Sequence, residues 1–161
     1  MVSVNQLKGY KICEEFSDDE LKKFADIATE EFYKAGDQIW EKGDPATKLC
    51  LLDEGKVLLT LETYMGTHRP PMQVTVDIIT KGGAMGWSAA VEPYVYTLGA
   101  RVIDDSQLIA IDAAQLREIL NADKALGFKF MQTIAKVVAT RLAHTEIILV
   151  GERGLSLLTE M

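Results

Sequence analysis

Hydrophobic positions along this chain change from a helical spacing to an alternating one and back again. Near the amino end, Leu21, Phe24 and Ala25 recur at helical spacing after Ser17-Asp18-Asp19-Glu20, a sequence typical of a capping box. From residue 29 to residue 112 the period is two, and turn residues divide this stretch into short segments. The expected strands are residues 31–34, 38–41, 48–52, 56–63, 72–79, 84–87, 96–103 and 107–112.

About eight short strands at this spacing favour a mainly β fold with flanking α-helices, of the double-stranded β-helix or jelly-roll type. After it we expect a short helix capped by Asp112, then a long C-terminal helix from about residue 123 to residue 150, ended by Gly151. The chain is therefore expected to form one domain. Residues 1–112 would hold the N-terminal helices and the β-roll, residues 113–150 the C-terminal helices, and residues 151–161 a tail.

The long helix carries two apolar stripes where packing against one roll needs only one. The first contains Met131, Ile134, Val138, Leu142, Thr145 and Leu149, and the second Leu126, Phe130 and Val137. The extra stripe predicts a homodimer formed through this helix. Its expected interface residues are Phe130, Met131, Ile134, Val138 and Leu142. The alternative is one broad apolar face that folds entirely onto the roll.

Composition narrows the classes of partner. The 161 residues carry 17 Lys and Arg against 24 Asp and Glu, a net charge of −7. An acidic chain has no bulk attraction for nucleic acid or for an anionic membrane. No apolar run has the length of a membrane span, and the first residues do not resemble a signal peptide, so we expect a cytoplasmic protein.

The sequence offers little material for catalysis or metal binding. Its only histidines are His68, in a proline-rich loop, and His144, on the long helix. A jelly-roll metal enzyme would need a histidine cluster with a carboxylate, and no Walker loop or nucleophile elbow is present. We therefore expect no catalytic residues, metal or cofactor, and a protein that is not an enzyme.

A glycine-rich stretch between two expected strands is the main candidate site. Gly82, Gly83 and Gly86 let the backbone turn sharply, Ser88 lies near the start of a short helical turn, and Pro93 prevents its continuation. Backbone N–H groups at the start of such a turn can bind an anion.

The order of these elements resembles a known family. A capped helix, turns at Gly36 and at Gly43-Asp44, a hairpin at Gly55 and the glycine-rich stretch follow one another at characteristic separations. This arrangement is similar to the cyclic-nucleotide-binding domain of the catabolite-activator (Crp/Fnr-like) superfamily, over about residues 15–150. The resemblance implies a β-roll, a phosphate-binding cassette at residues 82–101, a hinge and a dimerising helix.

The cassette departs from the family pattern at two positions. In nucleotide-binding members a glutamate contacts the ribose 2′-hydroxyl, and an arginine about ten positions later pairs with the cyclic phosphate. Here Trp87 stands at the glutamate position, and the arginine position falls on Tyr96 or Thr97. The cassette resembles a variant branch with Gly-Trp-Ser, so ordinary binding of cyclic AMP or cyclic GMP is not expected.

The sequence leaves open whether this site binds another small ligand. Trp87 would either stack on it or plug the site, and the alternative is that the aromatic residues simply fill the roll. The candidate ligand-binding residues are Met85, Gly86, Trp87, Ser88, Ala89, Tyr96, Thr97 and Leu98.

The function expected from the resemblance is that of a non-enzymatic sensor or regulatory module. Many relatives add a helix-turn-helix after the long helix, but residues 152–161 are too few to build one, so no direct nucleic acid binding is expected. Two alternatives stay open: a Crp/Fnr-type transcriptional regulator lacking its DNA-binding domain, and a ligand-free dimerisation or interaction module.

Overall fold

The fold begins with a helical N-terminal segment. The structure is a computed structural model that describes residues 1–160, with side chains to residue 154. It starts with α1 (Val4–Lys8), the 3₁₀ turn η1 (Lys11–Cys13) and α2 (Asp18–Asp26). The predicted capping box is confirmed, because the Glu20 N–H donates to Ser17 Oγ and the Ser17 N–H donates to Glu20 Oε1, each at 3.2 Å.

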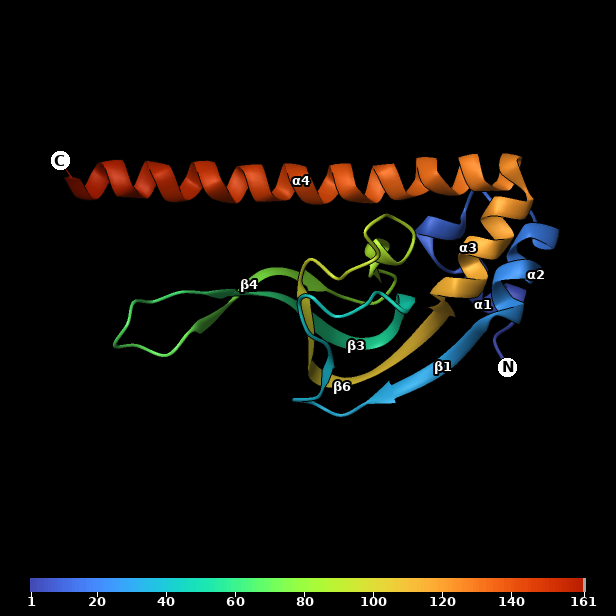
Figure 1. The fold of residues 1–161 in the computed structure, drawn as a ribbon, viewed down its shortest axis with the longest axis horizontal. Helices are drawn as coiled ribbons and strands as arrows, with labels where there is room; N and C mark the ends of the chain where they lie inside the picture. The colour runs from blue at the N-terminus through green and yellow to red at the C-terminus, as the bar shows by residue number, and fades with distance from the viewer. Residues whose placement is uncertain (161) are drawn as a thin grey trace.

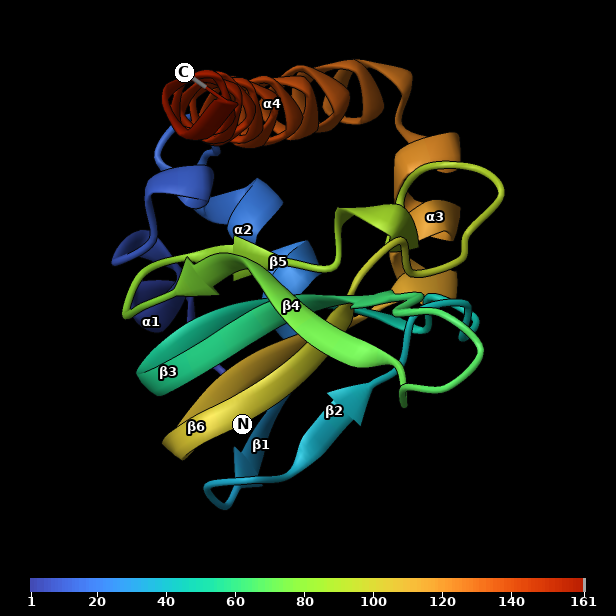
Figure 2. The same cartoon turned by 90° about the vertical axis from the view of Figure 1, so that its left-hand side faces the viewer.

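The strands form one curled antiparallel sheet that produces the predicted jelly-roll type of fold (Figure 2). The order along the sheet is β1-β6-β3-β4, with β2 paired to β6 and β5 paired to β3. The bounds are β1 (Ala28–Tyr33), β2 (Gln38–Trp40), β3 (Lys48–Thr63), β4 (Met72–Ile79), β5 (Ala84–Met85) and β6 (Gly99–Asp112).

Two pairs of predicted strands are in fact single long strands. Residues 48–52 and 56–63 join as β3. Residues 107–112 join the predicted strand 96–103 as β6, which begins only at Gly99. Gly55, predicted to turn the chain, lies where the β3–β6 register shifts, with a φ of 99°. A Cβ there would lie 2.1 Å from Ser106 Oγ, so the glycine allows a close approach inside a continuous ladder. The turn predicted at Gly55 is therefore an irregularity within the long strand β3.

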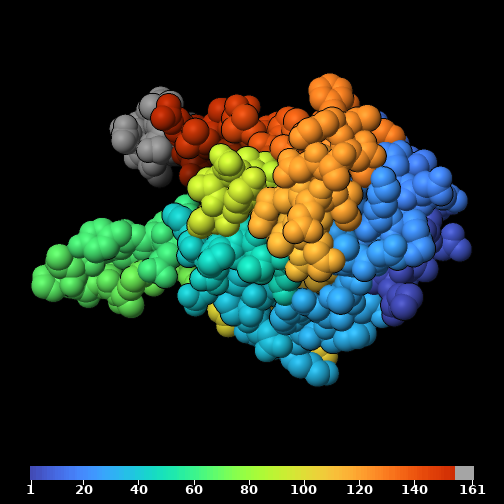
Figure 3. Space-filling model, turned by 45° about the vertical axis from the view of Figure 1, so that its right-hand side comes forward, coloured from blue at the N-terminus to red at the C-terminus, as the bar shows by residue number. Residues whose placement is uncertain are grey.

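The C-terminal helices cross one side of the roll. Asp112 caps α3 (Ala113–Ala122) as predicted, accepting a 2.8 Å hydrogen bond from the Gln115 N–H. The next helix, α4 (Lys124–Glu160), passes over the roll and projects beyond it, above the β3–β4 hairpin (Figure 1). In the space-filling view the hairpin is a separate projection (Figure 3).

The predicted end of the long helix at Gly151 is wrong. The helix continues through Gly151 to Glu160, so the tail expected at residues 151–161 is helical as far as it is described, and residue 161 lies outside the described residues. A single glycine inside a helix costs only about 1 kcal/mol relative to alanine. No helix in the described part of the chain is long and apolar enough to span a membrane.

The first turns of α4 are docked on the N-terminal segment by aromatic packing. Phe130 contacts Phe24 and Phe16, with ring centroids 5.7 Å and 6.2 Å away. Phe130 is 3% exposed and Ile134 2% exposed, so both belong to the protein's own core. They were predicted to face a second subunit, and in the folded chain they cannot do so. The remaining predicted positions differ: Met131 and Leu142 are exposed, and Val138 is partly buried.

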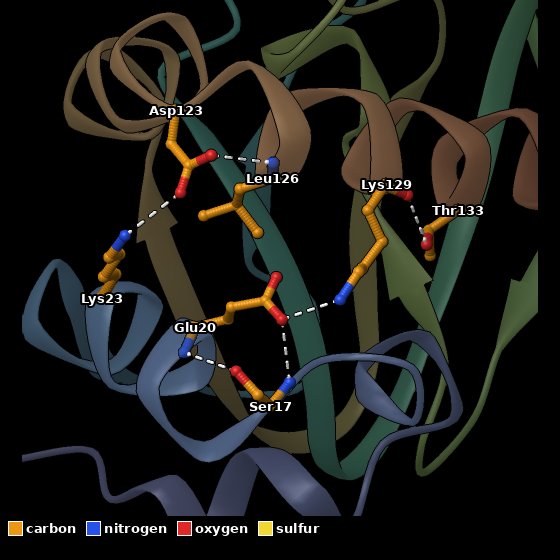
Figure 4. A network of polar contacts seen from close by, with 7 residues as sticks. All are labelled: Ser17, Glu20, Lys23, Asp123, Leu126, Lys129 and Thr133. Atoms are coloured by element: carbon orange, nitrogen blue, oxygen red, sulfur yellow. Dashed lines mark hydrogen bonds and ion pairs between the residues drawn. The ribbon is translucent and has the colours of Figure 1, made fainter.

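Polar contacts reinforce this docking (Figure 4). Lys129 of α4 pairs with Glu20 of the capping box at 2.7 Å, and Lys23 of α2 pairs with Asp123 at 3.4 Å. Asp123 also accepts a 3.1 Å hydrogen bond from the Leu126 N–H at the start of α4. Ion pairs and aromatic packing therefore both attach the beginning of α4 to the N-terminal segment.

We expect Phe130→Ala to lower the free energy of unfolding by about 3–5 kcal/mol, because it leaves a cavity beside the rings of Phe16 and Phe24. Urea unfolding followed by far-UV circular dichroism measures this. The matched control is Phe32→Ala, since Phe32 is 72% exposed and should change stability by less than about 0.5 kcal/mol. Equal losses in the two variants would contradict the assigned core.

Candidate functional site

The candidate cassette begins where β5 leaves the sheet. Met85 pairs with Cys50 of β3, and the chain then turns at Gly86, which has a φ of 83°. A Cβ on Gly86 would lie 2.9 Å from the Lys48 carbonyl oxygen and 3.2 Å from Trp40 Cη2. This position needs glycine both for its left-handed conformation and for its close approach to the roll interior.

One 3₁₀ turn, η2 (Trp87–Ala89), follows. The Ala89 N–H donates to Gly86 O and the Ala90 N–H donates to Trp87 O, each at 3.0 Å. Ser88 and Ala89 are buried, whereas Trp87 is only partly buried and packs against the core. The predicted helical turn is present, and its small residues let it sit close to the roll.

The second half of the cassette is attached to the turn between β2 and β3. Tyr96 donates its N–H to Asp44 O at 3.0 Å and accepts at its carbonyl from the Gly43 N–H at 2.9 Å. The Ala46 N–H donates to Tyr94 O at 2.8 Å. These backbone bonds fix residues 94–96 beside the mouth of the roll.

Tyr96 fills the interior at one of the two positions where a cation was expected. Its ring stacks on Trp40, with centroids 4.0 Å apart and planes 6° from parallel, and the residue is only 3% exposed. Its hydroxyl donates to Lys48 O at 2.8 Å and accepts from the Lys48 N–H at 3.1 Å. Burial raises the pKa of Tyr96, so the phenol stays neutral.

Trp40 completes this arrangement. Its Nε1–H donates to Leu98 O at 3.0 Å, and the residue is 6% exposed. The stack therefore joins β2, the start of β3 and the end of the cassette with its polar groups satisfied. Sequence reasoning missed this role of Trp40, because an indole in a short strand looks like any other core residue.

The cassette brings most of the predicted ligand-binding residues together but exposes few of them. Thr97, the alternative position for the cation, is exposed, and Leu98 and Trp87 are partly buried. The others are buried: Met85, Gly86, Ser88, Ala89 and Tyr96. The segment is thus a closed loop packed on the roll, with Trp87 its most accessible aromatic ring among those predicted to contact a ligand.

A cation does reach the cassette, but from α3. Arg117 donates through Nη1 to Ala89 O at 2.7 Å, and its guanidinium carbon lies 4.3 Å from the centroid of the Tyr94 ring. Arg117 therefore sits at the carbonyl end of η2, whereas an anion would be favoured at the amide end. No sequence pattern predicts this contact, because Arg117 lies on a helix that is remote from the cassette in the chain.

Two hollows in the described part of the chain are lined neither by η2 nor by Tyr96. A groove of about 640 Å³ runs beneath α4, between η1 and the β4–β5 connection, and is spanned by ion pairs from Arg141 to Asp77 at 3.1 Å and from Lys136 to Glu15 at 2.9 Å. The other, of about 430 Å³, lies beside Lys48. Among the described residues there is no cluster of three His, Cys, Asp or Glu side chains that could hold a metal ion.

Lys48 is neutralised within its own cluster. Its Nζ lies 2.5 Å from Glu31 Oε2 and 2.7 Å from the Tyr33 hydroxyl. Burial works to lower the pKa of Lys48, but the bonds to Glu31 and Tyr33 outweigh it and raise the pKa overall. The lysine is therefore a structural ammonium whose charge is already paired.

The comparison with known proteins agrees with this architecture. A family model described as the cyclic nucleotide-binding domain matches residues 30–123, more than half of the chain. The chain belongs to the cyclic nucleotide-binding domain family. No curated protein matches it.

Solved structures support the assignment of this cyclic nucleotide-binding domain. A putative cyclic nucleotide-binding protein from Geobacter metallireducens GS-15 is 32% identical, with a TM-score of 0.77; the match covers 88% of this chain and 99% of that one. A cyclic nucleotide-binding domain from Methylobacillus flagellatus KT has a TM-score of 0.79 at 14% identity, covering 94% and 86%.

The catabolite activator protein of Thermus thermophilus shares the fold at 19% identity and a TM-score of 0.67. The match covers 86% of this chain and 61% of that protein. The fold and family predicted from the sequence are thereby confirmed.

We expect Tyr96→Phe to destabilise this domain by about 1–3 kcal/mol, because the Lys48 N–H and C=O would lose their partner inside the protein. Thermal and urea unfolding measure the loss. The control is Tyr64→Phe, which removes a hydroxyl from a side chain that is 77% exposed. A Tyr96→Phe variant as stable as the parent would show that the hydroxyl does not hold the cassette.

Proposed function

We propose that this cyclic nucleotide-binding domain is a non-enzymatic regulatory module with a degenerate phosphate-binding cassette. The observation that carries the proposal is the Tyr96–Trp40 stack, bonded through the Tyr96 hydroxyl to both backbone groups of Lys48. It occupies the interior beside a position where the family pattern places a cation. Neither cyclic AMP nor cyclic GMP is an ordinary ligand of this chain.

Two energetic costs oppose the binding of a cyclic nucleotide in this cassette. A cyclic phosphate buried without a guanidinium partner loses a charge-assisted interaction worth about 2–5 kcal/mol. That corresponds to a loss of affinity of roughly 30-fold to several thousand-fold. Opening the interior would also break the hydrogen bonds of the Tyr96 hydroxyl. It would expose the stacked side chains of Tyr96 and Trp40, which are now 3% and 6% exposed. A different small ligand would have to approach Trp87, which is more accessible than the buried Tyr96.

The proposed output runs through α4. Its exposed apolar residues include Phe128, Met131, Leu142 and Leu149, which are 67%, 40%, 57% and 50% exposed and follow the spacing of a helix–helix seam. Beyond the roll, Ile147, Ile148 and Val150 are exposed as well. We infer a homodimer through this outward face, with Val138 at its edge, in place of the predicted interface that included Phe130 and Ile134.

The same closed cassette favours a second candidate function, a dimerisation or interaction module that uses no ligand at all. In that case α4 would keep one position relative to the roll. Binding of a small molecule to the purified chain separates the two candidates. The occupied state should shift the indole N–H resonance of Trp87 while leaving Trp40, which donates to Leu98 O, unchanged.

Isothermal titration calorimetry of cyclic AMP and cyclic GMP into the full chain should show no saturable binding in the low-micromolar range. The reason is the missing cation and the filled interior. A parallel titration monitored by the Trp87 and Trp40 indole resonances would detect binding that releases no measurable heat. A low-micromolar dissociation constant for either nucleotide would overturn the proposed degenerate cassette.

For the dimer, we expect sedimentation at tens of micromolar to give twice the chain mass, and Leu142→Glu to give the monomer mass. A glutamate in an apolar seam is desolvated without a partner. The control is Ala143→Glu: this position is also exposed but points about 100° away around the helix, so the dimer should persist.

Ile134→Glu does not serve as a test of this interface, since it places a charge in the core and should unfold the chain. A parent chain that sediments as a monomer, or an unchanged mass for Leu142→Glu, would refute the proposed interface.

A further inference from the structure

We propose that Arg117 is the positioning residue that couples the cassette to the C-terminal helices. It would transmit a displacement of η2 to α3, and through α3 to α4. The inference rests on the proposed regulatory function for its purpose, but the coupling itself needs no ligand and can be measured in the chain alone.

The two contacts of Arg117 enclose one segment of the cassette. Nη1 donates to Ala89 O at 2.7 Å at the end of η2, and the guanidinium lies 4.3 Å from the Tyr94 ring, five residues later. A planar guanidinium can donate in its plane and stack through its face at the same time. Arg117 is partly buried, which strengthens both contacts relative to an exposed arginine.

The two halves of the cassette are held in different ways. Residues 94–96 are bonded by their backbone to the β2–β3 turn, through Asp44 O, the Gly43 N–H and the Ala46 N–H. The η2 half packs by the small buried residues Ser88 and Ala89. Among the described side chains of α3 and α4, Arg117 is the one that donates a hydrogen bond to the cassette. A shift of η2 would therefore pull on α3 through this hydrogen bond.

From α3 the route continues through a tight junction. A Cβ on Gly127 would lie 2.6 Å from Leu120 O, so the start of α4 touches the end of α3 at backbone distance. The Asp123 N–H donates to Ile119 O at 3.1 Å, and the Gly127 N–H donates to Asp123 O at 2.8 Å. Arg117 lies one helical turn before Leu120, close enough for a rotation of α3 to reach this junction.

The geometry argues against the simpler idea that Arg117 replaces the missing phosphate-binding cation. It contacts a carbonyl oxygen at the C-terminal end of η2, where the backbone carries partial negative charge. Its flat face is occupied by Tyr94. A bound anion at this end would compete with the carbonyl for the same donors, so the contacts fit a connection between elements.

Native-state amide hydrogen exchange of the full chain tests the coupling. Arg117→Met keeps a long side chain but removes the charge and the donor. We expect at least about tenfold faster exchange at the Ala89 and Ala90 amides, and also at the Asp123 and Gly127 amides of the junction. Arg69→Met is the control, because Arg69 is exposed in the loop between β3 and β4, outside the cassette, and it should leave all four rates unchanged.

A double-mutant cycle separates coupling from local loosening. Tyr94→Leu alone should accelerate exchange at the junction, but it should have no further effect there once Arg117→Met is present. Arg117→Lys, which keeps the charge without the planar face, should give intermediate rates, and it provides the same comparison if Arg117→Met does not fold.

Faster exchange confined to Ala89 and Ala90, or additive effects of the two substitutions at the junction, would overturn the proposal. So would unchanged rates at all four amides. If the coupling is present and no small molecule is found to bind, the inference stands while the sensor form of the proposed function fails.

Discussion

The antiparallel pairing of β3 with β6 is the constraint on which the rest of the molecule depends. The two strands pair from Lys48 with Asp112 to Thr60 with Gly99, and their side chains include many of the fully buried residues of the core. The cassette leads into one end of β6, and α3 leaves from the other, capped by Asp112. A rigid ladder thus fixes both the candidate site and the base of the output helices, so that relative motion between them has to pass through side-chain contacts such as those of Arg117.

The interior of the roll beside the cassette is filled by side chains whose polar groups are paired. Gly86 still brings the backbone within van der Waals reach of Lys48 and Trp40. The space beside it is filled by an aromatic stack whose hydroxyl and indole N–H are both hydrogen-bonded to backbone. Because buried polar groups are costly to leave unpaired, this satisfied network stabilises the observed position of the cassette on the roll.

The long helix combines two different surfaces along its length. Its first turns are part of the core, through Phe130 and Ile134, and ion pairs from Lys129, Lys136 and Arg141 continue the attachment. Farther along, apolar side chains such as Leu142 and Ile147 are 57% and 70% exposed. A helix built in this way is anchored at one end and presents the other, as an element that carries a signal out of the domain would need to do.

Local sequence determined much of this protein. The capping box at Ser17, the cap at Asp112, the bounds of β4 and the jelly-roll class were all predictable, because they depend on residues close together in the chain or on a repeated spacing. The resemblance that gave the family rests on turn residues at fixed separations, which is also local information.

Tertiary structure decided the rest, since it depends on which residues meet across long distances. Spacing alone showed that α4 has more apolar surface than one roll needs, but only the packing of Phe16 and Phe24 on Phe130 settled which stripe faces inward. Gly55 was predicted to turn the chain, and only the pairing of β3 with β6 shows that it lies inside a long strand. Tyr96 could be placed in the cassette from the sequence, but its stacking on Trp40 and the reach of Arg117 to Ala89 arise from segments that the fold brings together. Patterns in the chain fix the conformation of each segment, whereas the contacts between segments fix what the site can do.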